Sequence, residues 1–348
     1  MTSTRDQPGT DGGVPAADIE IAEATVAATT GVTAPEAPDE TIAGATQPRS
    51  GRLPATAEGT SAAPFEPLDW GLVALAAVIW GASFLLIAEG LETMEPGVVA
   101  WLRIAFGFGA LALLPAARRT RIDRADVPRV VLVGAVWLAI PMTLFPVAEQ
   151  WVSSSVAGML NGSLPLFSAA ISAFFLRRAP GRNQLIGIGV GFLGVVAISL
   201  PSLDGGSKTA LGAALVIVAM VSYGFAGNLM VPLQQRYGSI AVIWRAQLVG
   251  LVLTTPYALT GVGSSSLAWK PLGSVFILGA FGTGVAFVAA GTLMGRVGAA
   301  RGAIVAYLIP VVALVLGVLL RDEHVEAIAI AGLGSVLVGA YLTSRAGR

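Results

Sequence analysis

Residues 154–200, SSVAGMLNGSLPLFSAAISAFFLRRAPGRNQLIGIGVGFLGVVAISL, contain two apolar runs, with a proline inside the first and a short basic turn between them. The same pattern returns 145 positions later, at residues 299–341, as AARGAIVAYLIPVVALVLGVLLRDEHVEAIAIAGLGSVLVGAY. Without a gap, Pro165 aligns with Pro310 and Gly194 with Gly339. Because the proline, the polar break and the glycine-marked second run keep one register, the stretch indicates an internal duplication.

The composition of the whole chain is that of a membrane protein. Of its 348 residues, 55% are hydrophobic and only 12% are charged, which is unlike an average soluble domain. A formal net charge of zero gives no sign of a basic surface for nucleic acid. The absence of cysteine excludes a disulfide framework, a thiolate zinc site and a cysteine nucleophile. His324 is the single histidine, so no site can contain two imidazoles.

Ten apolar runs follow a polar amino-terminal segment. Residues 1–66 are rich in Ala, Thr, Pro, Gly and acidic residues, and they predict a disordered tail. The runs are long enough to cross roughly 30 Å of hydrocarbon as helices, the only plausible spanning form for runs of this length. They lie near residues 70–89, 97–115, 128–147, 154–175, 184–200, 210–229, 239–259, 271–292, 299–320 and 325–343.

The arginines near the ends of these runs predict the orientation. If the amino terminus is inside, most of them fall in inner loops, while the outer loops contain mainly acidic residues. Both termini are therefore expected in the cytoplasm. An odd number of spans separates each half from its copy, so the second half enters the membrane upside down. The sequence predicts an all-α membrane protein with ten transmembrane helices, in two inverted five-helix repeats at residues 68–200 and 210–345.

An inverted repeat favours transport, because its halves can exchange conformations around a shared midplane site. Pro165 and Pro310 lie about midway through their spans, where each proline frees the carbonyl four residues earlier. Those carbonyls belong to Asn161 and Ala306, and at membrane depth they need protein or water as a partner. The alternative is an ordinary proline kink relieved by a neighbouring helix.

Polar and aromatic side chains inside the spans complete the expected substrate site. Arg103 and Arg245 could attract a carboxylate or phosphate or close one side, although an arginine two turns deep can also snorkel to the interface. Asn161 and Asn228 could bind a solute or bridge helices, and aromatic residues could line a pocket or anchor span ends. The full expected set is Trp80, Trp101, Arg103, Asn161, Pro165, Tyr223, Asn228, Arg245, Tyr307 and Pro310.

With these residues the chain resembles the EamA-type members of the drug/metabolite transporter superfamily, over residues 68–345. The matching features are WGASF at residues 80–84, Arg103 in the second span, and Pro165 before a charged exit. The duplicate has Pro310 followed by Arg321, Asp322 and Glu323. The resemblance implies a carrier of the cytoplasmic membrane that exports amino acids or related small solutes through a central cavity, without a cofactor. Arg177 and Arg178 depart from the family's glutamate in the first copy.

The energy source stays open between proton antiport, exchange and facilitated diffusion. No Asp or Glu lies in the middle of a span, and the candidate proton acceptors are Glu89, Glu149 and His324, at outer ends and loops. The sequence favours exposed loop residues as the interpretation of all three. No phosphate-binding loop is present to couple ATP.

Other functions find less support in the residues. An enzyme would need a motif such as His-Glu-x-x-His or Gly-x-Ser-x-Gly, and neither occurs. The nearer alternative is a flippase that moves a lipid headgroup past Arg103 and Arg245; a polar groove open to lipid would favour it. Glycines in the fifth and tenth spans allow close helix contact and make those spans candidates for a homodimer surface.

Overall fold

A computed structural model of the chain describes residues 65–176, 182–204, 206–297 and 304–344, which all fall within one compact unit, residues 53–348. Over these ranges the regular elements are all helical, without a β-strand. Apart from Phe65 and Glu66, the expected tail 1–66 lies outside the described residues.

Helices account for most of the described residues in the expected apolar runs. In chain order the elements are α2 (Pro67–Gly90), α3 (Pro96–Ala112), α4 (Pro115–Arg119), α5 (Val127–Val133), η1 (Gly134–Ala139), α6 (Ile140–Ala148), α7 (Ser154–Asn161), α8 (Leu164–Leu176), α9 (Arg182–Asp204), α10 (Ser207–Tyr237), α11 (Ser239–Gly261), η2 (Val262–Ser264), α12 (Trp269–Ile277), η3 (Leu278–Val285), α13 (Ala286–Val297), α15 (Val305–Arg321) and α16 (Ala327–Ser344).

Six helical stretches are long and apolar enough to cross a membrane: Pro67–Gly90, Val127–Ala148, Leu185–Ser202, Ser207–Gly227, Ser239–Ser264 and Trp269–Ala290. Three shorter apolar helices accompany them, at Pro96–Ala112, Val305–Arg321 and Ala327–Leu342. The chain is therefore a multi-pass membrane protein.

The fourth run differs from its expected single helix, because it is divided. α7 ends at Asn161, and α8 begins only at Leu164. The Ser163 hydroxyl donates to the Leu160 carbonyl at 2.6 Å, which competes with the regular helical pattern. Pro165 lies in the first turn of α8, where a missing backbone N–H costs least.

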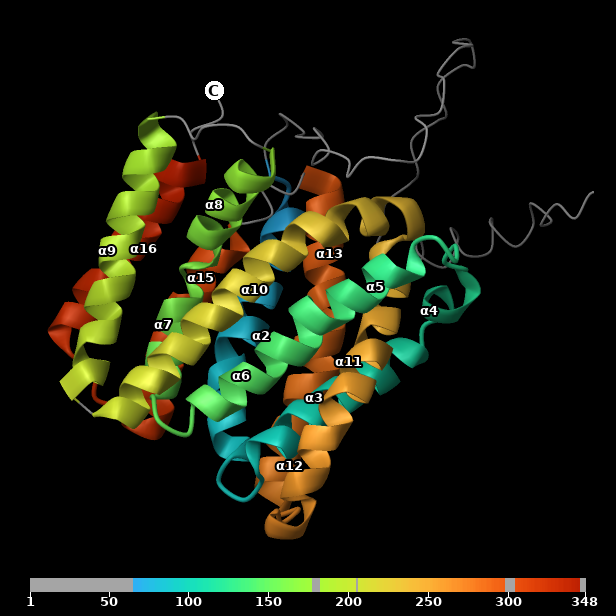
Figure 1. The fold of residues 1–348 in the computed structure, drawn as a ribbon, viewed down its shortest axis with the longest axis horizontal. Helices are drawn as coiled ribbons and strands as arrows, with labels where there is room; N and C mark the ends of the chain where they lie inside the picture. Colours follow the sequence, from blue (N-terminus) through green and yellow to red (C-terminus); the bar gives the residue numbers. More distant parts are fainter. Residues whose placement is uncertain (1–64, 177–181, 205, 298–303, 345–348) are drawn as a thin grey trace, which may run out of the picture. The chain divides into compact units, whose positions relative to one another are not determined.

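α9 and α16 lie side by side at one end of the helix bundle, as Figure 1 shows. A Cβ added to Gly194 would lie 2.6 Å from the Gly332 carbonyl oxygen, and one added to Gly339 would lie 2.5 Å from that of Gly187. The expected close contact between the fifth and tenth spans is thus present within one chain, and it depends on residues without a side chain.

Contacts between the two halves occur in matching pairs. α3 packs on η3, while α11 packs on η1. A Cβ on Gly279 would lie 2.5 Å from the Arg103 carbonyl oxygen, and one on Gly134 would lie 2.9 Å from that of Ala246. Gly134 and Gly279 are 145 positions apart, and Arg103 and Ala246 are 143 apart. The second span of each half thus meets the third span of the other half at equivalent points.

π-helical turns occupy these same points. η1 spans Gly134–Ala139 and η3 spans Leu278–Val285, at equivalent places in the third spans. A π-helical turn disturbs the regular backbone ladder, and side chains of the opposite half bond to its carbonyls. Ser222 Oγ donates to the Val136 carbonyl at 2.5 Å, and Trp80 Nε1 donates to the Gly282 carbonyl at 2.9 Å. One carbonyl of each π-helical turn therefore accepts a hydrogen bond from the other half.

Candidate functional site

A buried arginine lies at this junction. Arg103 on α3 is only 5% exposed, and its Nε donates to Thr283 Oγ1 of η3 at 3.0 Å. It does not snorkel to an interface. A buried guanidinium with one neutral partner keeps donors for an anionic group.

Thr283 also accepts a hydrogen bond through its backbone carbonyl. Gln247 on α11 is fully buried, and its Nε2 donates to the Thr283 carbonyl at 2.6 Å. Within the described ranges Gln247 Oε1 has no hydrogen-bond partner although it is buried. Thr283 was not among the expected site residues. The signal that could have found its segment is the spacing of Gly134 and Gly279, which are 145 positions apart, as Pro165 and Pro310 are.

Aromatic rings from both halves surround this region. Phe287 of α13 packs edge-on against Trp80 of α2 at 5.2 Å and against Trp137 of η1 at 4.6 Å between ring centroids. Phe145 of α6 lies 6.2 Å from Tyr223 of α10. Trp80 and Tyr223, repeat positions in the sequence, both pack against the two hydrophobic cores of the unit. Such a lining suits an apolar or aromatic solute group.

Glu149 adds an unpaired acid near the arginine. It directly follows the span Val127–Ala148, and both of its carboxyl oxygens are buried without a hydrogen-bond partner among the described residues. Burial, reinforced by the charge of Glu323, raises the pKa of the Glu149 carboxyl well above its ordinary value; Arg103 and Arg321 oppose this. The sequence also allowed Glu149 to be an exposed loop residue. The structure contradicts that interpretation, because both carboxyl oxygens are buried.

Glu323 has the opposite environment. Its Oε1 accepts from Ser154 N at 3.0 Å and from Ser154 Oγ at 2.7 Å, and its Oε2 accepts from Ser155 N at 2.8 Å. It therefore caps the amino terminus of α7 from the opposite half. Partial burial alone would raise the pKa of Glu323, but the bonds from Ser155 and Ser154 bring this pKa below its ordinary value.

Three of the other expected site residues serve helix packing or loop anchoring. Trp101 Nε1 donates to Thr255 Oγ1 at 3.0 Å, between α3 and α11. Arg245 donates to the carbonyl of Ala117 in α4 at 3.0 Å and to that of Thr120, directly after α4, at 2.5 Å. Tyr307 donates through its hydroxyl to the Ala340 carbonyl at 3.0 Å, joining α15 to α16.

Three of the four remaining expected residues lie around the break in the fourth run. Asn161 is 7% exposed at the end of α7, and Pro165 follows in α8. Pro310 of α15 packs beside the break, with its Cγ 3.0 Å from a Cβ added to Gly162. The side chain of Asn228 lies outside the described residues. The structure thus brings together Trp80, Arg103 and Tyr223.

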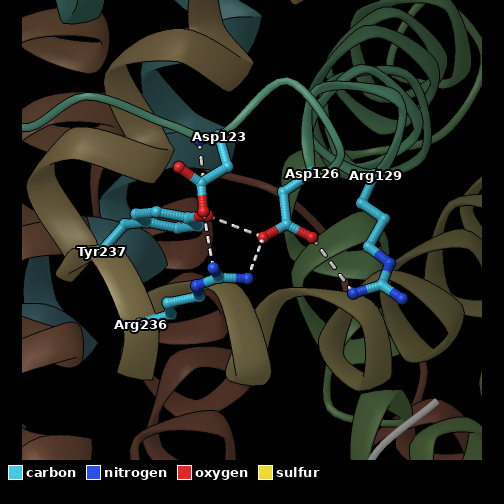
Figure 2. Close-up of polar contacts among 5 residues, drawn as sticks. All are labelled: Asp123, Asp126, Arg129, Arg236 and Tyr237. Atoms are coloured by element: carbon cyan, nitrogen blue, oxygen red, sulfur yellow. Dashed lines mark hydrogen bonds and ion pairs between the residues drawn. The ribbon is translucent and has the colours of Figure 1, made fainter. Parts of the chain in front are cut away.

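Charged groups join the halves where α5 begins, as Figure 2 shows. The buried carboxyl of Asp126 accepts from Arg129 at 3.2 Å, Arg236 at 2.8 Å and the Tyr237 hydroxyl at 2.7 Å. Arg236 also pairs with Asp123 at 2.5 Å. Desolvation and the bond to Asp126 raise the pKa of Tyr237 to about 12, so the phenol stays a donor at physiological pH.

Ion pairs also link α2 to the second half at both of its ends. Arg296 of α13 binds Asp69 at 2.6 Å near the start of α2. Arg321 of α15 binds Glu89 at 3.0 Å near its end, and Lys270 binds the same carboxylate at 2.6 Å.

Similarity to named proteins agrees with this arrangement. An "Uncharacterized transporter" of Archaeoglobus fulgidus is 29% identical over 79% of this chain and 98% of its own. A "Probable terminal-alkyne amino-acid exporter" of Streptantibioticus cattleyicolor is 27% identical over 79% of this chain and 93% of its own. A "Probable amino-acid metabolite efflux pump" of Escherichia coli is 28% identical over 79% and 94%.

A solved crystal structure, described without a function, shares the fold at a TM-score of 0.53 and 16% identity, over 79% of this chain and 95% of its own. The family model for EamA-like transporters matches residues 70–200 and again 210–345. The resemblance drawn from the sequence is confirmed, and the chain belongs to the EamA-like transporter family.

Proposed function

We propose that the protein is a secondary transporter that exports small amphipathic solutes, such as amino acids and related metabolites, from the cytoplasm. The observation that carries this proposal is the buried Arg103, bonded only to a neutral side chain at an aromatic-lined junction between the halves. A buried cation without a paired anion is costly unless a ligand supplies the anion. The substrate carboxylate would bind there.

The proposed site contains fewer residues than the set expected from the sequence. Arg103, Thr283 and Gln247 provide the polar contacts, and Trp80 and Tyr223 provide apolar surface. The names of two relatives, an amino-acid exporter and an amino-acid metabolite efflux pump, support this solute class.

Alternating access by two inverted five-helix repeats, residues 68–200 and 210–345, is the proposed mechanism. The matched contacts of Gly134 and Gly279 and the paired π-helical turns η1 and η3 support it. Two halves with equivalent packing can exchange their arrangements and expose the junction to each side in turn.

The ion pairs between the halves would break alternately in such a cycle. With both termini in the cytoplasm, as the arginine distribution favours, Asp126–Arg236 and Asp69–Arg296 close the inner side. Glu89–Arg321 closes the outer side. The arginine of each pair stays partly exposed, so it can be hydrated when the pair opens.

One groove among the described residues gives the lipid flippase alternative no support. A groove of about 330 Å³ lies between α2, α3 and α13, lined by Leu72, Ala110, Leu111, Leu114, Val285, Val288, Ala289 and Thr292. Its lining contains no charged residue, so it does not favour passage of a charged headgroup.

A comparison of metabolites inside and outside cells tests the proposal. Cells would lack the protein, overproduce it, or overproduce Arg103→Ala, Arg103→Lys or the exposed control Arg118→Ala. We expect overproduction to move an amino-acid-like solute outward, Arg103→Ala to abolish this, and the control to retain it. Unchanged soluble pools with altered lipid distribution would reject solute export in favour of the flippase.

A further inference from the structure

Glu149 is the buried titratable group that the proposed transport site does not yet use. Both of its carboxyl oxygens are shielded and without a hydrogen-bond partner in the described part of the chain, and no described cation lies within ion-pair distance. Burying an ionised carboxylate without a partner is strongly unfavourable. In the empty carrier, the neutral acid is therefore the favoured form.

The titratable groups to consider around Glu149 lie on α3, α10 and α2, which pack on α6, and at the end of α15. Arg103 is the single titratable residue of α3, and Tyr223 is the one on α10 that lies near Arg103. From α15 and the loop after it come Arg321 and Glu323.

The other titratable groups on those helices stand apart or are already paired. Lys208 is exposed at the start of α10, and Arg236 and Tyr237 bind Asp126 at its far end. On α2, Asp69 binds Arg296 and Glu89 binds Arg321 and Lys270. Arg103 is thus a buried cation of the described residues on a helix that packs directly on α6, its charge acts on Glu149, and a solute between them would meet one site of each sign.

We propose that Glu149 and Arg103 form a two-point site for solutes with both an ammonium and a carboxylate group, and that a proton on Glu149 competes with the solute's ammonium. This inference rests on the proposed export function and adds its coupling ion. The solute carboxylate binds the Arg103 guanidinium, as charge-assisted hydrogen bonds favour. Its ammonium binds ionised Glu149. The pair defines the substrate class as amino acids and close analogues.

The proton balance of the cycle follows directly. In the inward-facing carrier, binding of the ammonium breaks the carboxyl O–H bond of Glu149, and the proton passes to cytoplasmic water. In the outward-facing carrier, a proton from outside forms that O–H bond again, and the solute loses its partner and leaves. One proton enters for each solute exported, with no other reactant.

Proteoliposomes with an acidic interior test this exchange on the full-length chain. The probes are radiolabelled aliphatic and aromatic amino acids, supplied one at a time outside. With one proton exchanged per solute, a gradient of one pH unit supports about tenfold accumulation. We expect this accumulation from the wild type and from Glu95→Gln, an exposed acid next to the α3 span. We expect neither accumulation nor exchange of labelled for unlabelled solute from Glu149→Gln, because the amide can neither carry the proton nor pair with the ammonium, whereas Glu149→Asp should retain both activities.

Each remaining outcome supports or rejects proton coupling through Glu149. Exchange by the wild type without any effect of the pH gradient overturns the coupling but leaves the transport function intact. Gradient-driven accumulation by Glu149→Gln overturns it as well. If the amide variant fails in both assays, Glu149→Asp decides: restored accumulation supports the proposal, and continued failure rejects it.

A measurement without solute separates the proton site from the transport function. Infrared spectra of the purified protein in lipid at pH 7 should contain a protonated-carboxyl band that Glu149→Gln lacks and Glu95→Gln retains. Absence of that band overturns the proton site whatever the transport assays give. If the band is present but no amino acid is transported, the proposed function is rejected and the protonated state of Glu149 is still supported.

Discussion

Asp126 and Glu149 flank the same membrane span, Val127–Ala148, and their carboxyl oxygens have opposite surroundings. Asp126 accepts from two arginines and a tyrosine, whereas both oxygens of Glu149 are buried and have no hydrogen-bond partner in the described ranges. A satisfied buried carboxylate stabilises the fold, and an unsatisfied one costs stability unless it is protonated. The difference separates a structural acid from an acid available for function.

Removal of the satisfied acid should have the largest effect on stability. Asp126→Ala deletes the acceptor of three hydrogen bonds, and we expect it to lower the free energy of unfolding by about 2 kcal/mol. The cost stays below that of a fully buried pair because Arg129 and Arg236 can be hydrated. Thermal unfolding in detergent measures it. Asp123→Ala is the control, since its pair with Arg236 is more than half exposed on both sides, and its loss should cost under about 0.5 kcal/mol. Equal losses would contradict the distinction.

Replacement of Glu323, which accepts hydrogen bonds from Ser154 and Ser155, should have an intermediate effect on stability. Glu323→Gln weakens the cap of α7, and we expect a loss of about 1 kcal/mol at neutral pH. Because the pKa of Glu323 is lowered in the folded protein, its contribution exists above the unfolded pKa and is lost as the pH falls through the folded pKa. Unfolding temperatures recorded across acidic pH should therefore converge for the variant and the wild type. Parallel curves would show that the charge on Glu323 does not matter.

Replacement of the unpaired acid should have the smallest effect and the opposite pH dependence. The pKa of Glu149 is raised by folding, so the folded chain holds a proton that the unfolded chain releases. Wild-type stability should fall as the pH rises from about 4.3, the ordinary carboxyl value, through the raised folded pKa. Glu149→Gln should match the wild type within about 0.5 kcal/mol at low pH and should be the more stable protein at high pH. A variant that is less stable at every pH would mean that Glu149 has a hidden structural partner.

Composition and apolar run length were enough to predict a helical membrane protein, and its resemblance to the family was carried by residues such as WGASF at 80–84, Arg103 and Pro165. Long apolar runs must be helices in lipid, and the register of Pro165 with Pro310 marked the duplication before any contact was known. The prediction of a single fourth helix was wrong, because local bonds at Ser163 and the adjacent Pro165 end one helix and start another. Apolar length alone does not reveal such a break.

The sequence by itself predicted which segments are apolar enough to enter the membrane, since hydropathy depends on residue type alone. It also pointed to Arg103 and Trp80, because a charge or a tryptophan inside a span is unusual. Only the tertiary structure decided that Thr283 and Gln247 join Arg103, and that Arg245 and Tyr307 bind backbone carbonyls elsewhere. It likewise decided that Asp126 is paired and Glu149 is not. Partners in these pairs come from distant parts of the chain, and whether a polar group is satisfied depends on what folding brings next to it.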